Sequence, residues 1–353
     1  MKARSSTPPD CPVDFVLLWV DDSDPEWRAS MRRWKYISGI PVSELEDEDA
    51  NGECRYRDNG LLRYWFRGVE RFAPWVRRVF FVTCGQRPAW LDTSCPKLRP
   101  VSHAEFMPPD CLPTFHCNPI HFFLHRIQDL SERFVLFDDD MFLIRPVPPS
   151  AYFRGGLPVL PASLRMPHYR GDRLWNRFAF NNFYELNIRL DAGPAIRAHA
   201  GKWFNPFRLG PRHALANFVR YLLNRNIPAG DFGHLPLPHL KSTFDEIWHR
   251  CPAALSRTTT ARFRTHDQVT QWLSCAWNLA TGRFHPVPFP HRTPVFHVDR
   301  ESLPAVCAAI RSGRHSQICL QDKVDDPGGA SCMAEIRQAF EEILPGKSSF
   351  EKD

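Results

Sequence analysis

Three short apolar segments, each followed at once by polar residues, most constrain how this chain can fold. DFVLLWV (14–20), RRVFFVTCG (77–85) and RFVLF (133–137) are continuous apolar runs rather than alternating ones. This pattern is typical of strands buried on both faces, as in parallel sheets covered by helices. KLRPVSH (97–103) is a weaker fourth strand.

Amphipathic segments separate these predicted strands. A helix is expected to begin near Asp58 and Asn59, which can cap it. Its apolar stripe is Leu62, Trp65, Phe66, Val69 and Phe72. Asn118-Pro119 predicts a second helix start, with Asn as the cap and Pro in the first turn. The order of elements favours an α/β fold with a Rossmann-like, mostly parallel sheet, flanking helices and long Pro-rich loops.

The second half of the chain is less regular. Helices are expected at 212–225, 243–250, 267–280 and 333–344, between loops rich in proline. The helix at 212–225 is amphipathic, with Arg212, Arg220 and Arg225 on a basic face. That face could rest on an anionic bilayer as a peripheral membrane contact. A helix that packs on the core and leaves its basic face in solvent is the simpler interpretation.

Composition excludes several classes of protein. The formal net charge is only +6 over 353 residues, and no dense Lys/Arg block or nucleic-acid motif occurs, so no nucleic-acid partner is expected. No P-loop, GxGxxG or GxSxG motif is present. Eleven cysteines without a CxxC pair argue against a disulfide framework and suit a reducing interior. Without an apolar signal core or a span of transmembrane length, a cytoplasmic location is expected.

Acidic residues follow two of the predicted strands. Asp138, Asp139 and Asp140 repel one another unless a cation or a proton intervenes, and Mg²⁺ prefers such oxygen ligands. The alternative is a solvated acidic turn. Asp21 and Asp24 follow the first strand, where they could recognise a ribose or a base. A turn in which they cap backbone amides is equally open. Because ligands bind beyond the carboxyl ends of parallel strands, both clusters could share one edge.

Histidines are further candidates for chemistry. His121 and His125 stand four residues apart on a predicted helix, so a metal pair is conceivable. Two histidines on a partly exposed face are the simpler interpretation, since no carboxylate completes a metal-site spacing. His234 and His239 lie in a predicted Pro-rich loop and are acid–base candidates.

Basic residues near one another in the sequence could bind a diphosphate. Lys241, Arg262 and Arg264 form this group, with arginine as the bidentate partner. Ordinary surface charge is the alternative.

Together these segments resemble the Stealth family of sugar-phosphate transferases. The resemblance covers about residues 14 to 325 in four blocks. They are 14–27, 55–147 with gaps, 234–252 with 261–286, and ICLQDK at 318–323. It implies a single catalytic domain at 12–325, with a nucleotide-sugar-binding half at 12–150 and a helical and loop half at 151–325. Residues 1–11 would be a disordered lead-in and 326–353 a C-terminal helix and tail.

The resemblance also implies a glycosyltransferase-A-like fold and a reaction. An acceptor sugar hydroxyl attacks the sugar-bearing phosphate of a nucleoside-diphosphate sugar. A nucleoside monophosphate leaves, and a sugar–phosphate–sugar diester forms. The donor is expected to be a UDP-linked hexose or N-acetylhexosamine, and the acceptor an oligosaccharide or lipid-linked sugar in capsular or surface polysaccharide synthesis, at the inner face of the cell membrane.

Residue roles follow from the same resemblance. His234 would act as general base, and Asp139 and Asp140 would hold Mg²⁺ or Mn²⁺. Asp140 and Arg264 would join His234 in catalysis. The residues expected to bind substrate are Asp21, Asp24, Asn59, Arg63, Asn118, Lys241 and Asp322.

The chain departs from the family pattern at several polar positions. Asp138 stands where Asn is usual, and Gln321 stands where the family has Asn. His116, Cys117 and His121 replace Asn, Ser and Glu. Two alternatives therefore stay open: a metal-dependent glycosyltransferase that uses the same donor, and a degenerate, non-catalytic subunit of a polysaccharide assembly complex.

Overall fold

A computed structural model describes residues 12–40, 51–166, 173–228, 232–288, 294–322 and 329–352. The predicted lead-in at 1–11 lies outside the described residues. None of the helices in these ranges combines the length and the apolar character needed to cross a membrane.

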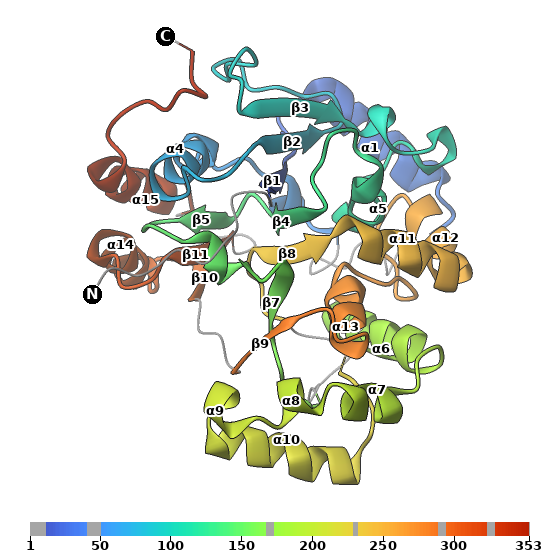
Figure 1. Ribbon diagram of the computed structural model, residues 1–353. Helices are drawn as coiled ribbons and strands as arrows, with labels where there is room; N and C mark the ends of the chain where they lie inside the picture. Colours follow the sequence, from blue (N-terminus) through green and yellow to red (C-terminus); the bar gives the residue numbers. More distant parts are fainter. Residues whose placement is uncertain are drawn as a thin grey trace.

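The centre of the molecule is a five-stranded sheet with the order β3-β2-β1-β4-β8 (Figure 1). Its strands are β1 (Val13–Leu18), β2 (Val79–Thr83), β3 (Leu98–Ser102), β4 (Arg133–Phe137) and β8 (Leu237–Leu240). The first four are parallel, and β8 runs antiparallel to β4. This confirms the predicted α/β class and its mostly parallel sheet, an arrangement consistent with a glycosyltransferase-A-like fold.

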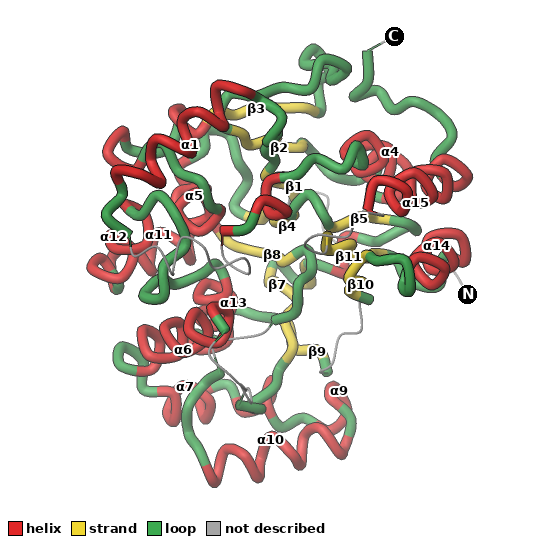
Figure 2. Tube along the Cα trace, turned by 180° about the vertical axis from the view of Figure 1, so that it is seen from behind, coloured by secondary structure: helices red, strands yellow, loops and turns green. Residues whose placement is uncertain are grey.

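Both faces of this sheet are covered, as the continuous apolar runs require. Phe15 and Leu17 of β1 pack into one core cluster, and Val16 and Leu18 pack into another on the opposite face. Helices α4 (Leu62–Phe72), α14 (Leu303–Ser312) and α15 (Gly329–Ile343) group on one side. On the other side lie α5 (Cys117–Phe123), α11 (Lys241–Arg250) and α12 (Pro252–Thr260), as both views show (Figures 1 and 2).

Two predicted helix starts are wrong in their caps. Helix α4 begins at Leu62 without a side-chain cap, because the Asp58 carboxylate accepts from the backbone N–H of Gly60 instead. Helix α5 begins at Cys117, two residues before the predicted start at Pro119. The amide of Asn118 then lies inside the helix and donates to Gln268 at 3.3 Å.

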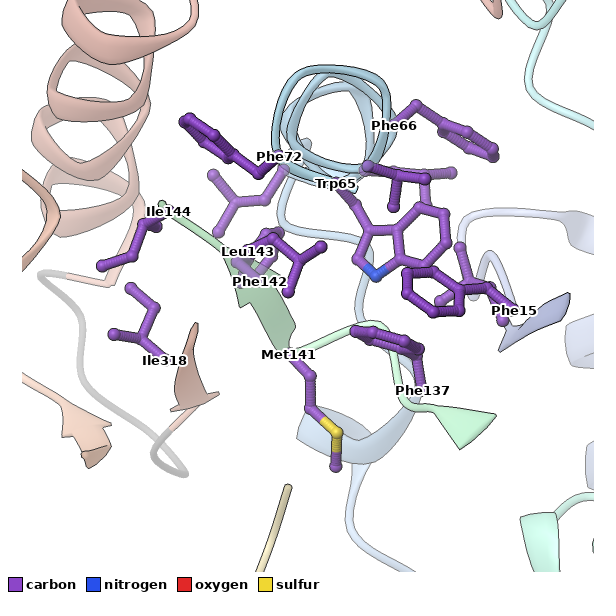
Figure 3. Packing of buried hydrophobic residues seen from close by; sticks show 14 of the residues in the cluster. Phe15, Trp65, Phe66, Phe72, Phe137, Met141, Phe142, Leu143, Ile144 and Ile318 are labelled. Atoms are coloured by element: carbon purple, nitrogen blue, oxygen red, sulfur yellow. The ribbon is translucent and has the colours of Figure 1, made fainter. Parts of the chain in front are cut away.

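Helix α4 packs tightly against β5 (Met141–Leu143), the short strand that follows the three aspartates. Trp65 points from α4 towards Phe15 and Phe137, beside Phe142 and Leu143 (Figure 3). On the same helix, a Cβ placed on Gly68 would stand 2.7 Å from the carbonyl oxygen of Leu143. Only glycine allows this approach, so α4 fixes where β5, and the turn before it, can lie.

The C-terminal segment belongs to this core. Phe350 is buried in the same cluster as α4, and the buried Glu351 carboxylate accepts from Arg63 and Arg67. Strand β5 also pairs antiparallel with β11 (Gln317–Asp322), which pairs with β10 (Val295–Val298). The last residues of the chain thus pack on the elements that position the 138–140 turn.

A second region lies below the sheet in Figure 1. A small sheet of β6 (Phe153–Arg154), β7 (Leu157–Pro161) and β9 (His285–Val287) leads into it. Its helices are α6 (Leu174–Asn187), α7 (Ala192–Ala198), α8 (Ala200–Trp203), α9 (Pro206–Leu209), α10 (Pro211–Leu223) and α13 (Trp272–Ala280). Helix α1 (Pro25–Ile37) lies beside the upper sheet.

Candidate active site

A pocket of about 350 Å³ opens at the carboxyl ends of the four parallel strands. The residues that follow β1, β3 and β4 line it, namely Trp19 and Val20, His103, and the three aspartates 138–140. This is where parallel α/β sheets bind ligands. The volume suits a ligand the size of a nucleotide.

The acidic turn lies between β4 and β5 and is closed by a hydrogen bond from the Met141 N–H to the Asp138 carbonyl at 3.2 Å. Burial and the neighbouring charges of Asp140 and Asp138 hold the pKa of Asp139 well above its usual range. Burial likewise raises the pKa of Asp138. Three carboxylates this close need positive charge beside them if all are to ionise.

His234 supplies part of that charge. Its Nε2 lies 2.9 Å from Asp140 Oδ2 and 3.9 Å from Asp138 Oδ2. Burial opposes its charged form, but the two carboxylates raise the pKa of His234 to about 9. Although burial acts against ionisation, the same pairing lowers the pKa of Asp140. Asp140 and His234 are therefore an ion pair at neutral pH.

Cys319 of β11 is the third group at this point. Its thiol lies 3.3 Å from Asp140 Oδ2 and can donate to it. Burial and the adjacent aspartates raise the pKa of Cys319 far above that of an ordinary thiol. Within the described residues, Asp140, His234 and Cys319 are the one trio of potential metal ligands with atoms within 4.8 Å of one another. Asp139, a predicted metal ligand, lines the pocket beside this trio rather than within it.

The donor set fits a hard divalent cation through its carboxylates. Asp140 Oδ1 is buried and has no hydrogen-bond partner among the described residues, and Asp139 offers a further carboxylate next to it. Carboxylate oxygens are the ligands that Mg²⁺ and Mn²⁺ favour. The Cys319 thiol stays protonated and is better suited to donate a hydrogen bond than to bind such an ion.

Arginines also line the pocket. Arg264 is buried, and its Nη2 lies 3.5 Å from the Cys117 sulfur. Its backbone is bonded to the Asn51 side chain in both directions. Arg55 and Arg57 line the same cavity. Arg55 was not among the predicted site residues, although it begins the 55–147 block of the family resemblance.

Aromatic side chains close the side of the pocket nearest the lower helices. Trp175 of α6 and Trp272 of α13 have ring centroids 6.3 Å apart, and the Arg55 guanidinium lies 5.6 Å from the Trp175 ring. All three line the cavity. Neither tryptophan was among the predicted site residues: Trp272 lies within the 261–286 segment of the family resemblance, and Trp175 lies outside its blocks.

Six of the predicted site residues line the pocket. They are Asn59, Asn118, Asp139, Asp140, His234 and Arg264. Four others do not. Asp21 accepts from the Ser23 N–H, and Asp24 caps α1 through the N–H groups of Glu26 and Trp27. The turn-forming alternative therefore describes their side chains.

Arg63 and Lys241 also lie outside the pocket. Arg63 pairs with Glu351 at 3.2 Å and covers the ring of Trp90. Lys241 stands at the other end of the sheet, where its ammonium donates to the carbonyls of Ile127 and Leu130. Arg262 donates to the Asp110 carbonyl. Asp322 ends β11 opposite Val298, and its side chain lies outside the described residues.

The remaining histidine hypotheses need correction. His239 is not in a loop but in β8, buried, and bonded to Ser274 at 2.6 Å; burial lowers its pKa to about 3. His121 is buried too, on α5, and His125 follows in a 3₁₀ turn (Leu124–Arg126). The simpler interpretation, two histidines together on a partly exposed helix face, is therefore wrong for His121.

The chain is similar to known proteins along nearly its whole length. Residues 12–37 match the model of Stealth protein CR1, conserved region 1, and residues 55–158 match that of Stealth protein CR2, conserved region 2. A capsular polysaccharide phosphotransferase, WcwK, of Streptococcus pneumoniae is 37% identical, covering 96% of this chain and 99% of the relative. A receptor polysaccharide phosphotransferase, WefC, of Streptococcus oralis is 35% identical, with the same two coverages. An exopolysaccharide phosphotransferase, cps2G, of Lactiplantibacillus plantarum is 33% identical, covering 96% of each chain. The chain therefore belongs to the Stealth family of phosphotransferases.

Proposed function

We propose that this enzyme transfers a sugar 1-phosphate from a nucleoside-diphosphate sugar to a hydroxyl of an acceptor sugar. The product is a phosphodiester in a capsular or other surface polysaccharide, as the names of its relatives suggest. The observation that carries the proposal is the pocket itself. It brings three carboxylates, an ion-paired histidine and a buried arginine together at the carboxyl ends of the parallel strands.

A divalent cation, Mg²⁺ or Mn²⁺, would be held by Asp139 and Asp140, and when bound it would neutralise charge on the donor diphosphate. Arg264 faces the same space, and its fixed backbone supports a role in binding a phosphate oxygen. Asn59 and Asn118 line the pocket as further polar contacts for the donor, a UDP-linked hexose or N-acetylhexosamine.

The tryptophan pair supports the acceptor side of the proposal. Trp175 and Trp272 offer apolar ring surfaces beside the polar Arg55, a combination that suits a sugar ring with its apolar and hydroxylated faces. The acceptor would be an oligosaccharide or a lipid-linked sugar. We infer that it enters from this side, while the donor diphosphate lies against the aspartates.

In the reaction, the acceptor oxygen forms a bond to the sugar-bearing phosphorus. The bond from that phosphorus to the bridging oxygen breaks, and the nucleoside monophosphate leaves with this oxygen. His234 would take the proton of the acceptor hydroxyl as general base. The Asp140 carboxylate orients the imidazole through its 2.9 Å contact with Nε2, and Nδ1 is then the nitrogen that can accept.

His234 can accept a proton only as a neutral imidazole, and the neighbouring carboxylates disfavour this form unless they also interact with another cation. In the cation-free site, Asp140 and Asp138 keep the pKa of His234 near 9, so the imidazole is already protonated at neutral pH. A divalent cation held by the carboxylates would reduce the amount by which they raise this pKa, and His234 would then be available as a neutral imidazole. The requirement for a divalent cation would thus extend to the base. We place the reaction in the cytoplasm, at the inner face of the cell membrane.

The test is a screen of nucleotide-sugars with an acceptor oligosaccharide, with and without Mg²⁺, read by mass spectrometry of both products. The proposal predicts nucleoside monophosphate together with a phosphodiester-linked sugar, only when cation and acceptor are present. Release of nucleoside diphosphate would identify a glycosyltransferase instead. Absence of turnover with every donor would favour the non-catalytic assembly subunit.

A matched pair of arginine variants tests the site itself. Arg264→Ala should lower kcat/KM about 100-fold, because it removes a fixed positive charge from the pocket. Arg262→Ala, two residues away, should leave kcat/KM unchanged, since Arg262 lies outside the pocket against Trp34. Equal effects of the two substitutions would refute the assignment of Arg264.

A further inference from the structure

Residues 192–230 carry an unusual charge. This stretch contains six Lys and Arg residues and no Asp or Glu. The six charges equal the formal net charge of the whole chain, +6. Arg208, Arg212 and Arg225 are exposed. The excess of positive charge is therefore concentrated in α7–α10 and the segment after α10, away from the acidic pocket.

Helix α10, in the middle of this stretch, presents apolar side chains to solvent. The face that it packs inward is small or polar: Asn217 is buried and bonded to the carbonyls of Ala162 and Trp203 and to the N–H of Leu164. The outward face carries the apolar residues Leu215, Phe218, Val219, Leu222 and Leu223. The expectation of a core-packed helix with a basic face in solvent is thus wrong in one respect, since the face in solvent is largely apolar.

The neighbouring helix α9 extends this surface. Phe207 is 97% exposed and Leu223 is 82% exposed. Packing within the molecule therefore covers little of either side chain. In Figure 1, α9 and α10 form the lower boundary of the molecule, and no other labelled element lies beyond them. We call the exposed apolar residues of α9 and α10, with their arginines, the α9–α10 face.

We propose that the α9–α10 face is a docking surface for an anionic lipid bilayer. The apolar side chains would enter the boundary between headgroups and acyl chains, and the arginines would lie among the headgroups. This is how interfacial amphipathic helices bind. Both kinds of residue are present on these helices, since the exposed Arg208 and Arg212 are close in sequence to the exposed Phe207 and Leu215.

Charge decides between a bilayer and a second copy of the chain. Two copies joined through this face would bring their arginines together, and no carboxylate of residues 192–230 could balance them. An anionic membrane surface supplies the missing negative charge and attracts Lys and Arg residues close to it. The inference concerns binding and does not depend on the reaction. If the proposed reaction is correct, it would place the enzyme where a lipid-linked acceptor is found.

The experiment is co-sedimentation of the full-length protein with vesicles. One set contains equal amounts of phosphatidylglycerol and phosphatidylcholine, and the other only phosphatidylcholine. We expect binding to the anionic vesicles that weakens as salt is raised. The double variant Leu222→Asp/Leu223→Asp should reduce this binding at least about tenfold, because it places two charges on the inserted face. Arg208→Glu/Arg212→Glu should remove the preference for anionic lipid.

The matched control is Tyr36→Asp/Ile37→Asp. These residues are also exposed and apolar, but they lie at the end of α1, and their loss should leave vesicle binding intact. Circular dichroism checks that each variant is folded. Absence of wild-type binding even at low salt would overturn the proposal. So would equal binding by the leucine variant, or a wild-type dimer that this variant dissociates in light scattering. Because no donor is present, these outcomes are independent of the reaction.

Discussion

The contact between α4 and β5 gives a prediction whose size can be worked out from one distance. Substituting Gly68→Ala adds a Cβ that would stand 2.7 Å from the Leu143 carbonyl oxygen and 3.7 Å from its carbonyl carbon. The first distance is well inside van der Waals contact, and both atoms belong to the backbone, so neither can rotate away. The helix and β5 must separate to relieve the clash.

Two opposing effects set the magnitude. Alanine is favoured over glycine in a helix interior by about 0.5–1 kcal/mol. Forcing an extra carbon into a packed core costs about 1–3 kcal/mol, and a rigid backbone neighbour places Gly68 in the upper part of that range. We therefore expect Gly68→Ala to lower the free energy of unfolding by about 1–2 kcal/mol. The same shift should lower activity, because β5 carries the turn 138–140.

Urea unfolding followed by circular dichroism measures this change. Gly201→Ala is the control, since a Cβ on Gly201 in α8 meets nothing within 4 Å. That substitution should leave stability unchanged or raise it by up to about 1 kcal/mol. A Gly68→Ala protein as stable as the wild type would refute the reasoning, because it would show that α4 and β5 are not held at this distance.

Three further outcomes are expected. Asp14→Ala should lower the free energy of unfolding by about 3 kcal/mol, measured in urea, because the buried carboxylate accepts two hydrogen bonds from Arg77 at 2.8 and 2.5 Å. In chelator-treated protein, the His234–Asp140 pair should stabilise the fold fully below pH 6.5, and this contribution should be lost as the pH rises through about 9. The urea midpoints of wild type and Asp140→Asn should converge over that window; a gap that widens would contradict the raised pKa of His234. Trp272→Ala should raise KM for the acceptor while leaving KM for the donor unchanged. A selective rise in KM for the donor would contradict the proposal that the acceptor binds beside Trp175 and Trp272.

The central sheet and the two aspartates of the site, Asp139 and Asp140, could be predicted from the sequence for a physical reason. Continuous apolar runs mark strands buried on both faces, and the residue that follows such a strand must lie at the sheet edge. Asp139 and Asp140 lie at that edge. By contrast, Asp21 and Asp24 follow β1 but are used by local backbone amides, and spacing alone could not decide between these two uses.

Strand direction explains why two predicted site residues of the segment 234–252 lie at opposite ends of the sheet. Because β8 runs antiparallel to β4, His234 precedes it at the carboxyl end of the parallel strands, whereas Lys241 follows it at the opposite end. Each residue of a strand adds about 3.4 Å, so a few positions suffice to separate them. The sequence of residues 234–241 does not indicate whether the strand runs parallel or antiparallel to β4. The start of α4 separates Asn59 from Arg63. Asn59 precedes the helix and lines the pocket, whereas Arg63 lies in its first turn and pairs with Glu351 in the C-terminal segment.

Long-range partners were beyond prediction as well. Cys319 contacts Asp140, which is 179 residues away in the sequence, and Arg264 contacts Cys117, which is 147 residues away. The five departures from the family pattern now have places in the fold: Asp138, His116, Cys117 and Gln321 line the pocket, and His121 is buried. Four of the five thus line the pocket, and we propose that they bear on the choice of donor and acceptor.

The central claim is that phosphorus, and not only the sugar, moves from donor to acceptor. The most direct measurement uses a nucleotide-sugar radiolabelled in the sugar-proximal phosphorus, incubated with Mg²⁺ and an acceptor oligosaccharide. The label should appear in the oligosaccharide, in a linkage that alkaline phosphatase does not release, and unlabelled nucleoside monophosphate should accumulate in equal amount. Label that stays entirely in a nucleoside diphosphate, with the sugar alone transferred, would contradict the account.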